Sequence, residues 1–121
     1  MIYKFKKLIV WQKAMELTVS IHRLTQFFPE KDKSGLSIQI NQAATLVPVL
    51  IAQGSRCQDR KELCQYLEKA ETALYELLTL VYLAANLEYF SRDCLKQLEA
   101  SISNISQLLG SLIKYITQVN E

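Results

Sequence analysis

The sequence predicts an all-α protein, an antiparallel four-helix bundle of up-down-up-down topology. In four segments, apolar residues recur at alternating steps of three and four, which keeps their side chains on one face of an α-helix. Only three glycines and two prolines occur in 121 residues, and half of the residues are hydrophobic, which disfavours disorder and loop-rich β folds. The connections between the segments are short, so neighbouring helices must run in opposite directions.

The helices are expected in a single domain that spans residues 1–121. A chain of this length is long enough to bury one hydrophobic core and too short for two. The segment "FFPEKDKSG" separates the first two helices with breaker and capping residues, and Gly54 marks the end of the second. The expected helix bounds are 8–27, 34–54, 59–87 and 92–119.

Capping residues mark the starts of the last two helices. "DRKE" at 59–62 resembles a capping box, in which an oxygen of Asp59 accepts a hydrogen bond from the backbone N–H of Glu62. Ser91 is placed to cap the fourth helix. That helix carries the most regular apolar stripe of the chain, which predicts a core helix. The stripe consists of Leu95, Leu98, Ile102, Ile105, Leu109, Leu112, Ile116 and Val119.

The second helix contains the least polar segment of the chain, "AATLVPVLIA" at residues 43–52. Apolar side chains cover all its faces, whereas a bundle helix needs only one apolar stripe, so we expect its outer face to form an oligomer interface. Pro48 removes the helix hydrogen bond to the carbonyl of Ala44. We expect it to kink the helix and to shape this contact, because burial of the surrounding aliphatic side chains offsets the lost bond. The alternative is that Pro48 ends the helix and leaves 49–54 as a separate turn. The expected contact residues are Leu46, Pro48, Val49 and, from the third helix, Tyr66.

The net charge of +2 is unevenly divided along the chain. Residues 1–61 hold ten Lys or Arg and four acidic residues, a balance of +6, whereas residues 62–121 hold four and eight, a balance of −4. Such asymmetry indicates either an anionic partner or basic and acidic helices that lie side by side in the bundle.

No catalytic, metal or cofactor site is predicted. His22 is the only histidine, and the three cysteines, Cys57, Cys64 and Cys94, lack zinc-finger spacing. Neither a P-loop nor a G-x-G-x-x-G motif occurs. The chain begins without a signal-peptide pattern, and polar amides interrupt its uncharged second helix. We therefore expect a non-enzymatic, cytoplasmic protein without a cofactor or a membrane span.

Three stretches carry a resemblance to a known family: "FKKLIVWQKAMEL" at 5–17, "FFPEKDKSGLSIQINQAATLVPVLIAQG" at 27–54 and "KELCQYLEKAETALYEL" at 61–77. They resemble the four-helix-bundle family of 23S rRNA intervening-sequence proteins, which also includes relatives of the accessory variability determinant of diversity-generating retroelements (Avd-like proteins). The resemblance implies an antiparallel bundle that assembles into a cyclic homopentamer. For the retroelement members it implies a basic accessory protein that works beside a reverse transcriptase and its template RNA.

The resemblance also implies a nucleic-acid surface. Lysine and arginine bind phosphates through charge, without reading bases. The basic residues that match family positions are Lys7, Lys13, Arg56 and Lys61, and their basic neighbours are Lys4, Lys6 and Arg60.

Three positions depart from the family pattern. Asn41 and Gln42 stand where many members carry two arginines, and Gln53 stands where an acidic residue is common. Two phosphate contacts are therefore missing. The function expected from the resemblance is binding of structured RNA or an RNA/DNA hybrid. The alternative is an oligomeric protein-interaction module of the same family that binds no nucleic acid.

Overall fold

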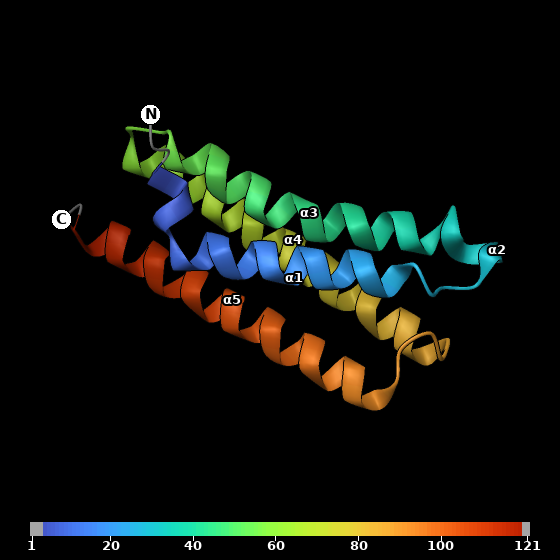
Figure 1. Ribbon diagram of the computed structural model, residues 1–121. Helices are drawn as coiled ribbons and strands as arrows, with labels where there is room; N and C mark the ends of the chain where they lie inside the picture. The colour runs from blue at the N-terminus through green and yellow to red at the C-terminus, as the bar shows by residue number, and fades with distance from the viewer. Residues whose placement is uncertain (1–3, 120–121) are drawn as a thin grey trace.

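The computed structural model describes residues 4–119 and confirms the all-α prediction (Figure 1). Four long helices alternate in direction: α1 (Ile9–Thr25), α3 (Leu36–Ser55), α4 (Arg60–Asn86) and α5 (Arg92–Val119). Two short helical segments precede α1 and α3, the 3-10 helix η1 (Lys4–Lys7) and the single turn α2 (Glu30–Lys33). The expected bounds of the four helices hold to within two residues at each end.

The helices pack in the cyclic order α1, α3, α4 and α5. The predicted stripe of α5 faces the core, with Leu98, Ile102, Ile105, Leu109 and Ile116 buried. Leu95 and Leu112 are half-buried, and the side chain of Val119 lies outside the described residues. Leucine, isoleucine and alanine from all four helices fill the centre, which accounts for the fold through apolar burial.

Helix starts are capped as the sequence predicts, with one difference. The Ser91 hydroxyl oxygen accepts a hydrogen bond from the backbone N–H of Cys94 at 3.1 Å. Asp59 is the N-cap of α4, but its carboxylate accepts from the N–H of Lys61 at 3.2 Å and not from that of Glu62. This one bond suffices to start the helix, because an N-cap side chain can accept from the backbone N–H of either the second or the third helical residue.

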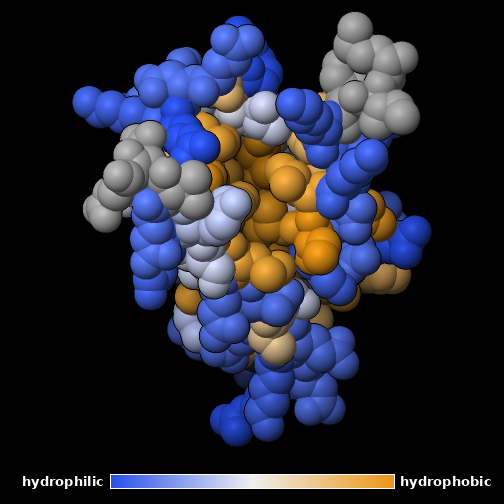
Figure 2. All heavy atoms as spheres, turned by 90° about the vertical axis from the view of Figure 1, so that its left-hand side faces the viewer, coloured by the Kyte–Doolittle hydropathy of each residue, from blue (hydrophilic) through white to orange (hydrophobic). Residues whose placement is uncertain are grey.

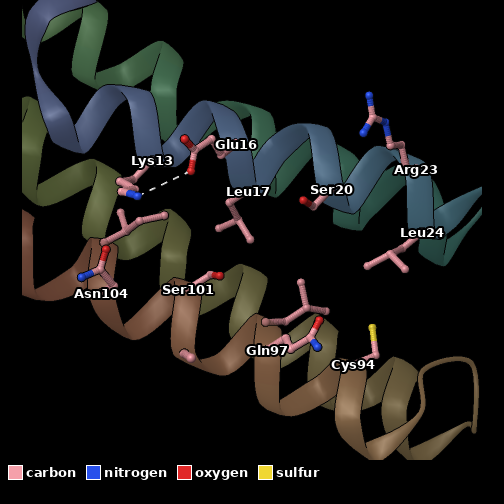
Figure 3. Close-up of a pocket in the computed structure, with 13 residues that line it drawn as sticks. Lys13, Glu16, Leu17, Ser20, Arg23, Leu24, Cys94, Gln97, Ser101 and Asn104 are labelled. Carbon is pink, nitrogen blue, oxygen red and sulfur yellow. Dashed lines mark ion pairs between the residues drawn. The ribbon is translucent and has the colours of Figure 1, made fainter.

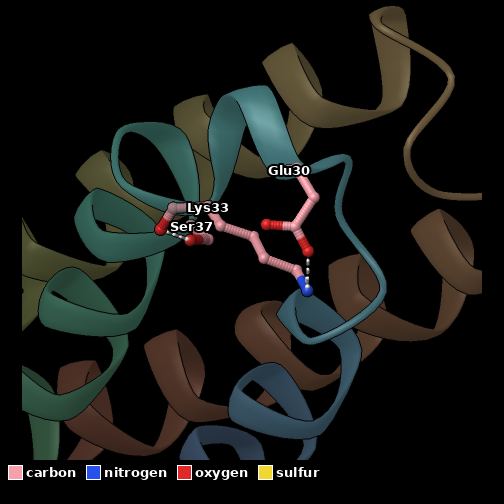
Figure 4. Close-up of polar contacts among 3 residues, drawn as sticks. All are labelled: Glu30, Lys33 and Ser37. Atoms are coloured by element: carbon pink, nitrogen blue, oxygen red, sulfur yellow. Dashed lines mark hydrogen bonds and ion pairs between the residues drawn. The ribbon is translucent and has the colours of Figure 1, made fainter.

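The segment expected to be a plain connection contains the α2 turn (Figure 4). Lys33 forms an ion pair with Glu30 at 3.0 Å across this turn, and the Ser37 hydroxyl of α3 donates to the carbonyl of Lys33. Pro29 stands at the N-cap of α2, a place that tolerates its missing N–H. The proline therefore starts a turn here, whereas the sequence pattern indicated only a helix break.

Aromatic side chains join the two connections at this end of the bundle. The ring of Phe28 lies 5.1 Å from that of Tyr89 and 5.3 Å from that of Phe90. The Tyr89 hydroxyl also donates to the Asp32 carboxylate. The chain between α1 and α3 is thus held against the chain between α4 and α5.

Pro48 does not end α3, which runs without interruption from Leu36 to Ser55. The carbonyl of Ala44, which loses its helix partner because proline has no N–H, lies 3.0 Å from the Thr18 hydroxyl of α1. The same hydroxyl lies 2.8 Å from the carbonyl of Ala14, so one hydrogen serves both acceptors. Ala44 and Thr18 are both buried, and a residue of another helix therefore replaces the bond that the proline removes.

Helix α3 ends at Ser55, one residue after Gly54, close to the expected end. A Cβ atom at Gly54 would stand 2.8 Å from the Cβ of Tyr66, so the glycine is required by the close approach of α3 and α4. Tyr66 itself is half-buried against the core, and the Nζ of Lys69 lies 5.1 Å from the centre of its ring.

One helix, α3, has the length and the hydropathy of a membrane span among the described residues. Half of that window is buried inside the bundle, where α3 packs between α1 and α4. Its apolar composition is accounted for by this central position.

A Schellman motif ends α4. The N–H of Tyr89 bonds to the carbonyl of Ala84 and the N–H of Glu88 to that of Ala85, both at 2.9 Å. Glu88 has a φ of 66°, a left-handed conformation that costs an ordinary residue about 1–2 kcal/mol.

Replacing Thr18 by Val should destabilise the fold, because the buried carbonyl of Ala44 loses its donor. We expect the free energy of unfolding to fall by about 1–3 kcal/mol, the cost of an unsatisfied buried polar group. In a Pro48→Ala background the cost should be smaller, since the new N–H at residue 48 bonds to Ala44. Urea unfolding of the four proteins in a double-mutant cycle measures this coupling. Equal costs in both backgrounds would contradict the assignment.

Glu88→Gly should stabilise the protein by about 0.5–1 kcal/mol, because glycine adopts a positive φ without steric cost. Thermal unfolding measures the change. The matched control is Glu76→Gly in the exposed middle of α4, which should destabilise the protein by about 1 kcal/mol. A lower melting temperature for Glu88→Gly would refute the prediction.

Candidate nucleic-acid interface

Basic residues from two distant parts of the sequence meet at one end of the bundle. The 3-10 helix η1 contacts both α1 and α3, and it lies beside the turn that joins α3 to α4 (Figure 1). The Gln12 side chain donates to the carbonyl of Lys6 at 2.8 Å, and the rings of Phe5 and Trp11 meet edge to face at 5.1 Å. These contacts fix η1 on the start of α1. We call the resulting cluster the basic end: Lys4, Lys6, Lys7, Arg56, Arg60 and Lys61.

All six side chains of the basic end are exposed. The described residues contain two ion pairs, Lys13–Glu16 and Lys33–Glu30, and neither involves the basic end. Two acidic residues, Asp59 and Glu62, lie in the same turn region. The basic end therefore keeps an excess of positive charge facing solvent, which favours an anionic partner.

The same end of the molecule has an apolar centre. Figure 2 views it directly and shows hydrophilic side chains around an apolar hollow. Leu8 before α1, Leu63 in the first turn of α4 and Ile113 near the end of α5 are half-buried hydrophobic residues that belong to this end. A ligand at the basic end would thus meet cations at the rim and apolar surface at the centre.

Lys13, the seventh predicted site residue, is placed differently. It points into a groove of about 600 Å³ between α1 and α5 and forms an ion pair with Glu16 at 3.7 Å (Figure 3). Ser20, Arg23, Gln97, Ser101 and Asn104 line the same groove. Since Lys13 has an acidic partner, it contributes less to a phosphate-binding surface than the six residues of the basic end.

The three residues that depart from the family pattern all lie on α3. Asn41 and Gln42 lie away from the basic end, and Gln53 lies beside the turn that follows α3. The Asn41 side-chain oxygen accepts from the Thr25 hydroxyl at 3.0 Å, so this residue joins α1 to α3. Gln42 and Gln53 are exposed. The neutral amide of Asn41 suits this contact between α1 and α3, whereas a guanidinium at the same place would need an anionic partner.

The predicted oligomer contacts fall into two groups. Leu46 and Val49 are each 41% exposed, as expected for an outer face, but they border different neighbours. Leu46 faces α4 beside Lys69 and Thr72, whereas Val49 faces α1. Pro48 is buried within its own chain and Tyr66 is half-buried.

The sequence stripes missed a groove between α1 and α3. Met15 and Val19 lie just outside the core stripe of α1 and are 38% and 43% exposed. With Val49 they line an apolar groove of about 580 Å³. The sequence signal for this groove was the four-residue spacing of Met15 and Val19 beside the complete core stripe of α1.

The other candidate reactive groups are possible metal ligands and the cysteine thiols. Among residues 4–119, no group of three His, Cys, Asp or Glu could hold a metal ion. Burial raises the pKa of the Cys94 thiol, and desolvation together with Glu62 raises the pKa of Cys57. Both thiols are thus protonated at neutral pH, unlike an activated cysteine. All three cysteines are half-buried.

Comparisons with known proteins agree with this architecture. A crystal structure of a Bacteroides thetaiotaomicron protein of unknown function, from the S23 ribosomal protein family, has a TM-score of 0.82 and 26% sequence identity. The match covers 88% of this chain and 99% of that one. No curated protein matches the chain. A family model for 23S rRNA-intervening sequence proteins matches residues 6–111, and the chain therefore belongs to this family.

Proposed function

We propose that the protein is a non-enzymatic accessory protein that binds structured RNA or an RNA/DNA hybrid through its basic end. The observation that carries the proposal is the convergence of six exposed cations without ion pairs among the described residues. Phosphate groups release counterions when such cations bind them, so the affinity is salt-dependent and largely independent of sequence. The chain belongs to the family of 23S rRNA-intervening sequence proteins, which is consistent with a nucleic-acid partner.

Self-association is part of the proposal. Met15, Val19, Leu46 and Val49 leave apolar surface exposed on a single copy, and such surface commonly marks a protein contact. A ring of five copies, which the family resemblance implies, would repeat the basic end around one axis. Binding of one RNA by several ends would raise the overall affinity without any new contact.

A role beside a reverse transcriptase is a narrower form of the same proposal. It rests on the resemblance to Avd-like proteins of diversity-generating retroelements. In that role the protein would act in the cytoplasm, without a membrane or a cofactor, and would hold template RNA near the enzyme through phosphate contacts.

The second candidate is a protein-interaction module without nucleic-acid affinity. The specific observation in its favour is the apolar hollow within the basic end (Figure 2), because phosphates gain nothing from apolar surface. A protein partner with acidic and apolar groups would use both features.

Binding of structured RNA should weaken steeply with salt, and removal of basic-end charges should flatten this dependence. We expect Arg56→Ala with Arg60→Ala to lower affinity and to reduce the slope of log K against log salt by about one for each phosphate that the variant no longer binds. Fluorescence anisotropy with a labelled RNA hairpin measures both quantities. Arg92→Ala, at the exposed start of α5 at the opposite end, is the matched control.

Two results would contradict RNA binding through the basic end. The first is an absence of binding by the unchanged protein at low ionic strength, which would favour the protein-interaction module. The second is an equal loss of affinity in Arg92→Ala and in the basic-end variant, which would place the contact elsewhere.

A further inference from the structure

The apolar groove between α1 and α3, hereafter the α1–α3 groove, is not filled by any described residue of the chain. Trp11, Met15 and Val19 form its α1 side, and Pro48 and Val49 form part of its α3 side. From Trp11 to Gln26, the groove follows α1 for fifteen residue steps, which at 1.5 Å per residue is about 22 Å. Its shape suits an amphipathic helix laid along it.

The charge of this groove has one sign. Among the described residues that line it, Arg23 is the only formally charged one, and none is acidic. His22 lies beside Arg23, with its Nε2 3.1 Å from the Thr45 hydroxyl. Thr45 in turn donates to the carbonyl of Asn41 at 2.7 Å, so its hydroxyl hydrogen is already used. The groove therefore favours a helix with apolar and acidic side chains.

The outer face of α4 offers such a helix. Tyr75 is 65% exposed and Tyr82 is 41% exposed. These residues share one helical face with Glu68, Thr72 and Thr79, which together we call the α4 stripe. Glu71, Glu76 and Lys69 adjoin it, so the stripe and its border carry three carboxylates and one cation. The Tyr82 hydroxyl donates to Glu99 of α5 at 2.5 Å.

The two threonines make the α4 stripe less polar than its amino-acid composition indicates. The Thr72 hydroxyl donates to the carbonyl of Glu68 at 3.2 Å, and that of Thr79 donates to the carbonyl of Tyr75 at 2.9 Å. Both hydroxyls are therefore satisfied by their own helix. From Glu68 to Tyr82 the stripe covers fourteen residue steps, about 21 Å, which matches the length of the α1–α3 groove.

A chain cannot fill its own groove with its own stripe. In the cyclic order of the bundle, α3 lies between α1 and α4, and α4 is fixed in the core through Leu67, Leu74 and Leu77. The complementary surfaces can meet only between copies.

We propose that the α4 stripe of one copy seats in the α1–α3 groove of the next. Tyrosine rings then cover Met15, Val19 and Val49, and acidic side chains of α4 lie near Arg23. The contact joins two different surfaces, so each copy has one free groove and one free stripe, and the assembly closes into a ring or extends as a filament. This assignment deepens the self-association part of the proposed function, on which it rests, by naming both sides of the contact.

Two variants that each block one side provide the test. Val49→Glu places a carboxylate in the groove against an acidic stripe, and Tyr75→Lys places a cation on the stripe against Arg23. Each alone should behave as a single 13.9 kDa chain in light scattering. Mixed in equal amounts they should form a complex of two chains, since the first retains a working stripe and the second a working groove.

Tyr115→Lys is the matched control, because Tyr115 is 64% exposed on α5 outside both surfaces. It should keep the mass of the unchanged protein. Circular dichroism checks that all variants fold, and Met15→Glu replaces Val49→Glu if that variant does not. The inference is overturned if the unchanged protein is a single chain, if either blocking variant keeps the unchanged mass, or if the mixture stays as single chains.

The test is separate from that of nucleic-acid binding. The variants leave all six cations of the basic end in place. An unaltered mass in Val49→Glu would overturn this contact while RNA binding stands. Absence of RNA binding by an assembled protein would overturn the proposed function while the contact stands.

Discussion

The structure depends on a row of side-chain hydrogen bonds that join α1 to α3. Thr18 serves the carbonyl that Pro48 leaves open, the ring of His22 meets Thr45, and Thr25 donates to Asn41. Helix α3 carries no charged residue between its ends, so its polar groups must be satisfied by such partners when it is buried between α1 and α4. These contacts fix the register of α1 on α3, and with it the position of every later element.

That register determines what lies at each end of the bundle. Because α1 and α3 are antiparallel, the start of the first lies beside the end of the second, which brings η1 to the turn after Ser55. Cations separated by about fifty residues thereby share one surface. Rotation about a single axis keeps equivalent atoms at one height, so a cyclic assembly would place all basic ends on a common level. The sides of the bundle would then contact other copies of the chain, and the basic ends would contact a different partner.

Local patterns in the sequence predicted most of the fold. The stripes fixed four helices, and Ser91 and Asp59 marked two starts, because caps and periodicity act within a few residues. The continuity of α3 through Pro48 was expected from the apolar run around it, but the hydrogen bond that compensates for the proline was not predictable in this way, since its donor is Thr18, thirty positions earlier. Gly54 shows the same limit, because its role depends on Tyr66 of another helix. At the candidate site, residue types indicated cations, but only the topology separates Lys13, paired in its groove, from the basic end.

The uneven charge of the two halves had two explanations, an anionic partner or pairing between neighbouring helices. No basic helix of the first half lies against an acidic helix of the second: α1 carries a formal charge of +1 and packs against α3, which carries none, and against α5, which also carries +1. The ion pairs of residues 4–119 join positions three apart on α1 and on α2 and never bridge two helices. The positive field of the first half is therefore not neutralised by direct contact with α4 and α5. This positive field remains available to ligands outside the chain. Phosphates would bind at the basic end, and the acidic α4 stripe of another copy would lie at Arg23. The same charge asymmetry therefore favours both proposed contacts.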